Sequence, residues 1–329
     1  MRIEAKELRD QKRDKLWEVI PLSTPFLVYL DPANICNLRC KFCPTGYNNL
    51  VKLRDNGIMQ FGVFTSIVDD FKEFDKKVRK FNLYKEGEPL INPLFIEMVK
   101  YLKDANVADQ IWTKTNGLKL NPEYNTTLLK SGLDLLAISI KHISSEKYKD
   151  ICGIRIDYDL LLKNLKDLFN KRENVKIYIS ICDASLTPEE RDKFYNDFEP
   201  ISDFCAIEGL HGQSFNAGID FKMGTNNTYD GTPLNEKIVC PLCLHSLVFN
   251  YNGTVSLCNE DWTHACIVGD VTKNSVKEIW NGKERFNFMK MHLEGRRSEN
   301  ISCKNCDYIS VLPDNVDEHR NEILRKLYE

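Results

Sequence analysis

The sequence predicts an α/β protein: a partial (β/α)6 TIM-like barrel followed by a small C-terminal α+β domain. Three observations support this prediction. Short β-type runs alternate with amphipathic helical patterns through the first two thirds of the chain, the alternation breaks near residue 213, and most cysteines fall into two groups on either side of that break. Alternating strands and helices indicate a mostly parallel sheet with the helices outside. Six repeats are too few for a closed eight-stranded barrel, so we expect an open one.

The expected strands are short apolar runs, and they span 26–34, 78–87, 109–117, 133–141, 174–183 and 204–212. Helical periodicity lies between them, at 61–76, 93–105, 122–131, 159–170 and 187–198. The last of these helices has a clear start, with Thr187 as N-cap, Pro188 at the first helical position and Glu190 at the third. Ligands of such a barrel gather at the carboxyl ends of the strands, and we expect the site there.

We expect five segments: an N-terminal helical extension (1–25), the barrel (26–212), a linker (213–239), a cysteine-rich domain (240–310) and a C-terminal helix (311–329). The linker is rich in Gly, Asn and Thr. The cysteine-rich domain starts with a predicted hairpin that turns at Asn252-Gly253, and short helical patterns follow at 275–280 and 283–294. This domain has little apolar content of its own, so a bound metal would help to hold it together.

Composition excludes several classes of partner. The chain has 329 residues, of which 42% are hydrophobic and 28% charged, and its formal net charge is −3. No basic field favours nucleic acid or an anionic membrane. The first twenty residues carry charges throughout and no apolar segment, and no apolar run is long enough to span a bilayer. We therefore expect a cytoplasmic protein, in which clustered cysteines bind metal more often than they form disulfides.

The first cysteine group is the CxxxCxxC motif of Cys36, Cys40 and Cys43, directly after the first expected strand. A structural zinc site takes four ligands, usually as two paired knuckles, and no fourth Cys or His lies nearby in the sequence. Three thiolates on one tight loop suit three irons of a [4Fe–4S] cube and leave the fourth iron open to a substrate or cofactor.

With Phe42 before its last cysteine, this motif resembles that of the radical S-adenosylmethionine (SAM) superfamily. Weaker motifs of that family follow in order: "YKEGEPL" (84–90) is similar to its GGEP turn, with Glu86 in place of the first glycine, and "TNG" (115–117) and "SIKHI" (139–143) match later segments. The family often has an acidic residue where this chain has Lys141. The resemblance implies a SAM site formed by Phe42, Gly87, Glu88, Asn116, Ser139 and Arg155.

The same resemblance implies a mechanism. SAM chelates the open iron, and one electron from the reduced cluster cleaves it to methionine and a 5′-deoxyadenosyl radical. That radical takes a hydrogen atom from an unactivated C–H bond of the substrate. The cofactor supplies this chemistry while the protein positions it. An electron donor such as flavodoxin or ferredoxin is implied.

The second group holds six cysteines between 240 and 306. Cys240/Cys243 and Cys303/Cys306 read alternatively as two zinc knuckles, but such pairs usually lie roughly 15–20 residues apart. Here nearly sixty residues separate them, and Cys258 is left unexplained. The segment resembles the SPASM/twitch extension of radical SAM enzymes. That resemblance implies a second, auxiliary [4Fe–4S] cluster held by Cys240, Cys258, Cys303 and Cys306, with Cys243 as an alternative to Cys240.

Other candidates carry weaker signals. Cys182, at the end of the fifth expected strand, would be placed to donate a hydrogen atom, and His211, after the sixth, to contact substrate. For both residues, as for Cys152 and Cys205, a structural role is the simpler interpretation.

The favoured function is a radical SAM oxidoreductase that dehydrogenates a small polar substrate, a secondary alcohol of a sugar or aminocyclitol. The basis is a resemblance to twitch-type enzymes such as the 2-deoxy-scyllo-inosamine dehydrogenases. A peptide-modifying maturase and a sugar epimerase stay open as alternative enzymes. An iron–sulfur electron carrier is the non-enzymatic alternative, against which the ordered SAM motifs argue.

Overall fold

One curved sheet of nine strands runs through the computed structural model, which describes residues 2, 14–46, 54–183, 186–209, 228 and 232–328. The strand order is β6-β5-β4-β3-β2-β1-β7-β8-β9. All pairs from β6 to β7 are parallel, and β8 and β9 add antiparallel pairs at one edge. The strands are β1 (Leu27–Leu30), β2 (Val78–Asn82), β3 (Ala108–Thr115), β4 (Leu135–Ile140), β5 (Lys176–Cys182), β6 (Phe204–Glu208), β7 (Ser246–Phe249), β8 (Thr254–Ser256) and β9 (Ile267–Asp270).

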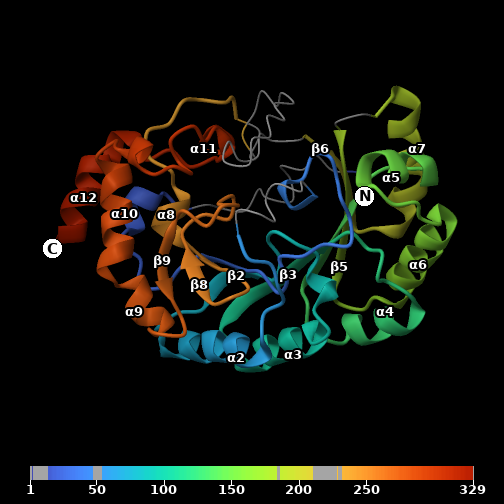
Figure 1. Ribbon diagram of the computed structural model, residues 1–329, viewed down its shortest axis with the longest axis horizontal. Helices are drawn as coiled ribbons and strands as arrows, with labels where there is room; N and C mark the ends of the chain where they lie inside the picture. The colour runs from blue at the N-terminus through green and yellow to red at the C-terminus, as the bar shows by residue number, and fades with distance from the viewer. Residues whose placement is uncertain are drawn as a thin grey trace.

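The helices of the first two thirds alternate with these strands, as the sequence predicts. They are α1 (Leu16–Val19), α2 (Phe61–Asp70), α3 (Phe95–Ala105), α4 (Pro122–Leu129), α5 (Ser145–Cys152), α6 (Tyr158–Lys171) and α7 (Pro188–Phe198). Figure 1 shows α2, α3, α4 and α6 on the outer side of the curved sheet. Their apolar faces bury Phe64, Val99 and Leu165 in the main core. The α/β class and the open barrel are therefore confirmed.

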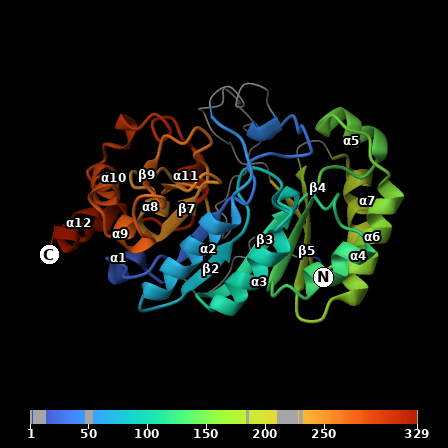
Figure 2. The ribbon, with the colours of Figure 1, turned by 60° about the horizontal axis from the view of Figure 1, so that its bottom comes forward.

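The remaining helices form the other end of the molecule: α8 (Leu242–His245), α9 (Val276–Trp280), α10 (Lys283–Leu293), α11 (Tyr308–Val311) and α12 (Arg320–Tyr328). Figures 1 and 2 both show this orange and red lobe at the end opposite α5, α6 and α7. Trp280 joins it to the main core, because its side chain is fully buried and its indole N–H donates to the Leu22 carbonyl at 2.9 Å.

The C-terminal hairpin continues the barrel sheet directly. β7 lies parallel to β1, with Leu27 opposite Ser246 and Leu30 opposite Phe249. The predicted hairpin turn is present, and Gly253 takes a positive φ of 88° there, a conformation that glycine adopts without strain. The five domain boundaries stay a prediction, since the sheet crosses from the barrel into the small domain and much of 213–239 lies outside the described residues.

The ends of individual elements follow local sequence signals. Thr187 caps α7 as predicted, because its hydroxyl accepts from the Glu190 N–H while the Glu190 carboxylate accepts from the Thr187 N–H. The expected N-terminal extension is helical in its described part only over Leu16–Val19. Among the described residues, no helix combines the length and apolar character needed to cross a membrane.

Candidate active site and iron–sulfur sites

The CxxxCxxC loop starts at the carboxyl end of β1 and ends in a short 3-10 turn, Pro44–Gly46. Its tight course depends on Gly46, where a Cβ atom would lie 2.5 Å from the Cys40 carbonyl oxygen. Leu38, in the middle of the motif, is only 2% exposed and anchors the loop in the core. The motif therefore lies where the sequence predicts, at the end of the sheet that collects ligands in barrels of this kind.

The C-terminal end of α5 holds this loop from one side. The backbone N–H groups of Arg39 and Lys41 donate to the carbonyls of Cys152 and Ile151, each at 2.9 Å. These two bonds satisfy carbonyls that a helix end otherwise leaves without partners. They also place Cys152, the last residue of α5, directly against the motif: its Sγ lies 3.5 Å from the Cys40 Sγ.

The protein alone does not stabilise thiolates on this loop. Burial raises the pKa of Cys36 to about 12, and burial also raises the pKa of Cys43. Cysteine ligates metal as the thiolate. A cationic iron centre that replaces these protons supplies the missing stabilisation, since metal binding deprotonates a coordinating thiol. The donor set of the loop thus fits a bound cluster.

The "EGEP" turn packs its backbone against the cysteine loop. A Cβ atom on Gly87 would lie 2.1 Å from the Ala33 carbonyl oxygen and 2.4 Å from that of Ile35, so only glycine fits. Glu88 follows with its N–H donating to the Ile35 carbonyl at 2.9 Å. The sequence-predicted SAM residue Gly87 is therefore placed directly beside the loop that carries the cysteines.

Both carboxylate oxygens of Glu88 are engaged inside the protein. One accepts from the Thr115 hydroxyl at 2.6 Å and from the Leu90 N–H at 3.2 Å, and the other accepts from the Asn116 N–H at 2.7 Å. Burial raises the pKa of Glu88. The side chain of Asn116 in turn donates to Asn37 in the cysteine motif at 2.7 Å. Glu88 and Asn116 therefore tie the "EGEP" and "TNG" turns to the cysteine loop.

Ser139, on β4, is held by a residue that sequence reasoning treated only as a departure from the family pattern. The Lys141 ammonium donates to the Ser139 hydroxyl at 2.7 Å. Burial acts to lower the pKa of Lys141, but the electrostatic interaction with the nearby cysteines, first Cys40 and then Cys43, outweighs it and raises that pKa. Lys141 is thus a positive charge close to the first cysteine site, where many family members would have an acidic one.

The remaining predicted residues lie in varied surroundings. Phe42 is half-buried against the core, and Cys182 ends β5 opposite Glu208 of β6. The Arg155 side chain is 65% exposed and pairs with Glu146 at 3.5 Å, an exposed ion pair of α5. His211 lies outside the described residues. Of these four, only Phe42 belongs to the cysteine loop itself.

The second cysteine group lines one pocket. His292 and Arg297 contribute to its lining. All six cysteines of the C-terminal third line it as well: Cys240, Cys243, Cys258, Cys266, Cys303 and Cys306. We call it the auxiliary pocket. These cysteines come from the start of α8, the segment after β8, the approach to β9 and the turn before α11. The fold thus brings together every predicted auxiliary ligand.

Two cysteines in this pocket, Cys240 and Cys243, differ in their surroundings. The Cys243 thiol is 2% exposed and donates to the Cys240 carbonyl at 3.1 Å. Its proton is therefore already used by the backbone, which favours Cys240 as the ligand. On the opposite side, the Arg297 guanidinium donates to the carbonyls of Cys303 and Cys306 at 2.5 and 3.2 Å and fixes the CxxC turn.

Burial also disfavours a free thiolate at two of the predicted auxiliary ligands, Cys240 and Cys306. It raises the pKa of Cys240 to about 12 and that of Cys306 to about 11. Cysteines that come from several segments and line one pocket can serve as ligands of a cube, in which each binds a different iron.

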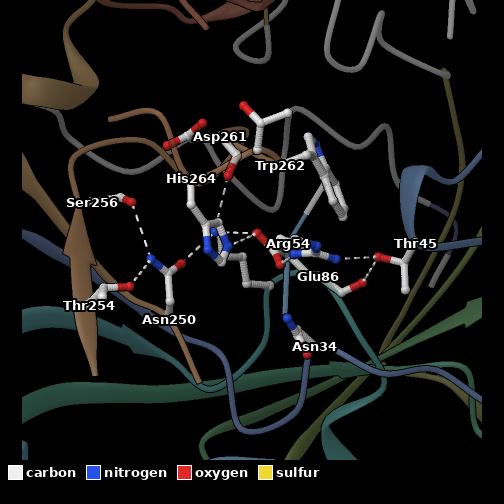
Figure 3. Close-up of polar contacts among 12 residues, drawn as sticks. Asn34, Thr45, Arg54, Glu86, Asn250, Thr254, Ser256, Asp261, Trp262 and His264 are labelled. Atoms are coloured by element: carbon white, nitrogen blue, oxygen red, sulfur yellow. Dashed lines mark hydrogen bonds and ion pairs between the residues drawn. The ribbon is translucent and has the colours of Figure 1, made fainter. Parts of the chain in front are cut away.

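A buried polar cluster joins residues of the barrel loops and of the auxiliary domain (Figure 3). It is centred on Glu86, the residue that replaces the family's first glycine. Glu86 pairs with Arg54, with Lys85 at 2.5 Å and with His264 at 3.0 Å. Lys85 also donates to Asn250, at the end of β7, at 2.8 Å. In the sequence, His264 lies between Cys258 and Cys266, two cysteines of the auxiliary pocket. The contact of His264 with Glu86 therefore connects the barrel loops to the auxiliary domain.

Asp31 completes this region from the carboxyl end of β1. It is 1% exposed, and neither of its carboxylate oxygens has a hydrogen-bond partner of good geometry. Burial raises the pKa of Asp31 to about 6, and the nearby cations Lys85 and Arg54 only partly offset this. Sequence reasoning missed this cluster. The one signal for it was the carboxylate at position 86 where the family pattern has glycine.

Comparison with known proteins agrees with this geometry. The model of the radical SAM superfamily matches residues 30–198, slightly more than half of the chain. The chain belongs to the radical SAM superfamily. The model of the SPASM iron–sulfur cluster-binding domain matches residues 240–307, the segment that carries the auxiliary pocket. As a member of the superfamily the protein is an enzyme, and its cofactors are SAM and two [4Fe–4S] clusters.

Curated relatives match over different extents. The S-adenosyl-L-methionine-dependent 2-deoxy-scyllo-inosamine dehydrogenase of Niallia circulans is 23% identical over 290 residues, 87% of this chain and 94% of that protein. A tungsten-containing aldehyde ferredoxin oxidoreductase cofactor-modifying protein of Pyrococcus furiosus is 28% identical over 148 residues, 45% of this chain and 39% of the other. A GTP 3′,8-cyclase of Petrotoga mobilis is 31% identical over 162 residues, 49% and 48% of the two chains. The last two matches thus span less than half of the relatives.

Solved structures share the fold at low sequence identity. BtrN in complex with AdoMet and 2-DOIA has a TM-score of 0.60 at 18% identity, over 88% of this chain and 96% of BtrN. Native anSMEcpe with bound AdoMet has a TM-score of 0.59 at 14% identity, over 92% and 96% of the two chains. Streptococcus suis SuiB bound to its precursor peptide has a TM-score of 0.58 at 15% identity, over 90% and 73%.

Proposed function

We propose that the enzyme oxidises a secondary alcohol of a sugar or aminocyclitol to the ketone. The observation that carries this proposal is the match to the 2-deoxy-scyllo-inosamine dehydrogenase, which spans 87% of this chain and 94% of the relative. The likeness to BtrN with 2-DOIA supports a shared fold. Cys36, Cys40 and Cys43 would hold the first cluster, and Cys240, Cys258, Cys303 and Cys306 the auxiliary one.

The proposed reaction removes one hydrogen atom, one proton and one electron from the alcohol. When bound, SAM and the first cluster supply the radical that takes the hydrogen atom, and the auxiliary cluster supplies an acceptor for the electron. Four protein thiolates leave no open iron, which suits electron transfer better than substrate binding. The chain itself must bind the substrate, exclude water and accept the proton.

Asp31 is our candidate for the proton acceptor. A general base works best with a pKa near the operating pH. Burial raises the pKa of Asp31 to about 6, and its carboxylate lies at the carboxyl end of β1, close to Lys85 and Arg54. Glu86, Lys85 and Arg54 would support it by fixing its polar surroundings. A flavodoxin or ferredoxin would supply the electron that starts turnover.

An isotope experiment tests the proposal. The reconstituted enzyme is incubated with SAM, a reductant and aminocyclitols or sugars that carry deuterium at single alcohol carbons. The proposal predicts deuterium in 5′-deoxyadenosine, and one ketone formed per SAM cleaved. Recovery of an inverted alcohol with solvent hydrogen at the labelled carbon would instead show epimerisation, with Cys182 as the candidate donor. Turnover of a peptide only would show a maturase.

A further inference from the structure

Two cysteines outside the proposed ligand sets lie in contact with ligands. Cys152 Sγ is 3.5 Å from Cys40 Sγ, and Cys266 Sγ is 4.0 Å from Cys303 Sγ. Cys152 is fully buried, and Cys266 is 1% exposed. Two thiolates on separate irons of a cube point away from each other, so each close pair supplies one ligand and one neighbour. Each predicted cluster site therefore holds one further thiol whose sulfur contacts a predicted ligand sulfur.

The fold fixes Cys152 through the backbone. The Cys152 carbonyl accepts from the Arg39 N–H at 2.9 Å, and the neighbouring Ile151 carbonyl accepts from Lys41. Gly153 then ends α5 in the left-handed region, at a φ of 75°. Because these contacts are made on both sides of Cys40, the thiol of Cys152 has little freedom to turn away from it.

Cys266 is fixed through side chains. Its N–H donates to one Asp261 carboxylate oxygen at 2.6 Å, and the other oxygen accepts from the Ser302 hydroxyl at 2.8 Å. Asn300 adds a second link, because its amide donates to the Ala265 carbonyl at 2.9 Å and its Oδ1 accepts from the Cys266 thiol at 3.6 Å. These contacts connect the segment between Cys258 and Cys266 to the turn that carries Cys303.

We propose that Cys152 and Cys266 donate S–H hydrogen bonds to the cluster-bound thiolates of Cys40 and Cys303 and thereby raise the reduction potentials of the two clusters. A metal-bound cysteine has lost its proton and can only accept, so the neighbouring thiol must donate. Hydrogen bonds to cluster sulfurs favour the reduced, more negative state and are one of the protein's means of setting the potential.

The consequence differs between the two sites. At the first cluster a higher potential eases reduction by the external electron donor. At the auxiliary cluster it makes the site a better acceptor for an electron from the substrate. The inference rests on the ligand sets proposed above, but not on the identity of the substrate.

Another buried cysteine serves as a matched control. Cys205 is fully buried in β6, outside both cysteine groups. Replacing it by alanine removes a buried thiol without removing a contact to a predicted ligand sulfur.

The test is a redox titration followed by EPR on the reconstituted full chain without SAM or substrate, together with iron and sulfide analysis. Cys152→Ala is expected to lower the potential of the first cluster only, and Cys266→Ala that of the auxiliary cluster only. Cys205→Ala should shift neither. Cys152→Ser and Cys266→Ser restore an O–H donor of similar size and should recover part of the shift, which a packing role would not.

Three results would overturn the inference. If both alanine variants kept all their iron and their reduction potentials were unchanged, Cys152 and Cys266 would not act as hydrogen-bond donors to the clusters. Serine variants that behave like alanine would assign the shift to packing. A loss of about four irons in either alanine variant would show that the thiol is itself a ligand, and the proposed ligand sets would then be wrong. None of these results depends on alcohol oxidation, so a different substrate class would leave the inference standing.

Discussion

The two cysteine sites are built in opposite ways. The first takes Cys36, Cys40 and Cys43 from eight consecutive positions, and backbone bonds to the end of α5 hold their loop. The auxiliary pocket gathers cysteines from four separate segments between 240 and 306, and side chains such as Arg297 and Asp261 hold those segments together. The ligands of a local site can therefore be predicted from their spacing in the sequence. The ligands of a distributed site depend on contacts between segments that spacing does not reveal.

The largest expected effect separates the roles of the two sites. Cys40→Ala should abolish the formation of 5′-deoxyadenosine, because the first cluster loses a ligand and SAM loses the iron that it would chelate. Cys258→Ala should abolish formation of the ketone while SAM cleavage continues, because the substrate radical has no acceptor for its electron. Chromatography of both products from each variant checks this. Loss of SAM cleavage in Cys258→Ala, with the first cluster still loaded, would contradict the division of labour.

The buried polar cluster around Glu86 should give a pH-dependent effect. The pKa of Asp31 is raised by burial to about 6. A raised carboxyl pKa means that the folded protein holds its proton longer than the unfolded chain does. Wild-type stability should therefore fall as the pH rises from about 4 to about 6, by ~3 kcal/mol for a shift of about two units.

Asp31→Asn should remove this pH-dependent loss, and the variant should be the more stable protein at pH 7. Urea unfolding of both proteins at pH 4 and pH 7 measures the difference. Asp134→Asn is a suitable control, since that carboxylate is partly exposed and pairs with Lys103 at 3.1 Å at the far end of β4. An equal pH dependence in wild type and Asp31→Asn would refute the interpretation of Asp31 as a buried, destabilised carboxylate.

A smaller effect is expected from removing the arginine that contacts the backbone of each cysteine site. Arg297→Ala removes two bonds to the carbonyls of the CxxC turn and should speed loss of the auxiliary cluster roughly 10-fold, as expected for an outer-shell partner of a metal site. Arg39→Ala is the matched variant. The Arg39 side chain is exposed and donates to the Cys36 carbonyl at 2.6 Å, but its loop keeps the bonds to α5.

Cluster loss is followed by absorbance after addition of an iron chelator. Arg39→Ala should behave nearly as the wild type does. If both arginine variants lost their clusters at the same increased rate, the two sites would depend equally on side-chain contacts.

The sequence predictions that the structure confirms rest on local signals. The alternation of strands and helices, the N-cap of α7 and the hairpin turn depend on residues close in the chain, and each is present. The parallel pairing of β1 with β7 joins segments more than 200 residues apart, which no periodicity reveals. The partners of Glu86 and the approach of Cys266 to Cys303 were missed for the same reason, since they arise only when distant loops meet.

The central claim is that the chain builds two separate [4Fe–4S] sites, and counting iron tests it most directly. Anaerobically reconstituted wild type should contain about eight irons and eight sulfides, and the Cys36/Cys40/Cys43 triple alanine variant about four of each, without zinc. About four irons in wild type and none in the variant, with one zinc in both, would contradict the claim. The auxiliary pocket would then be a structural zinc site, and the proposed oxidation would lose its electron acceptor.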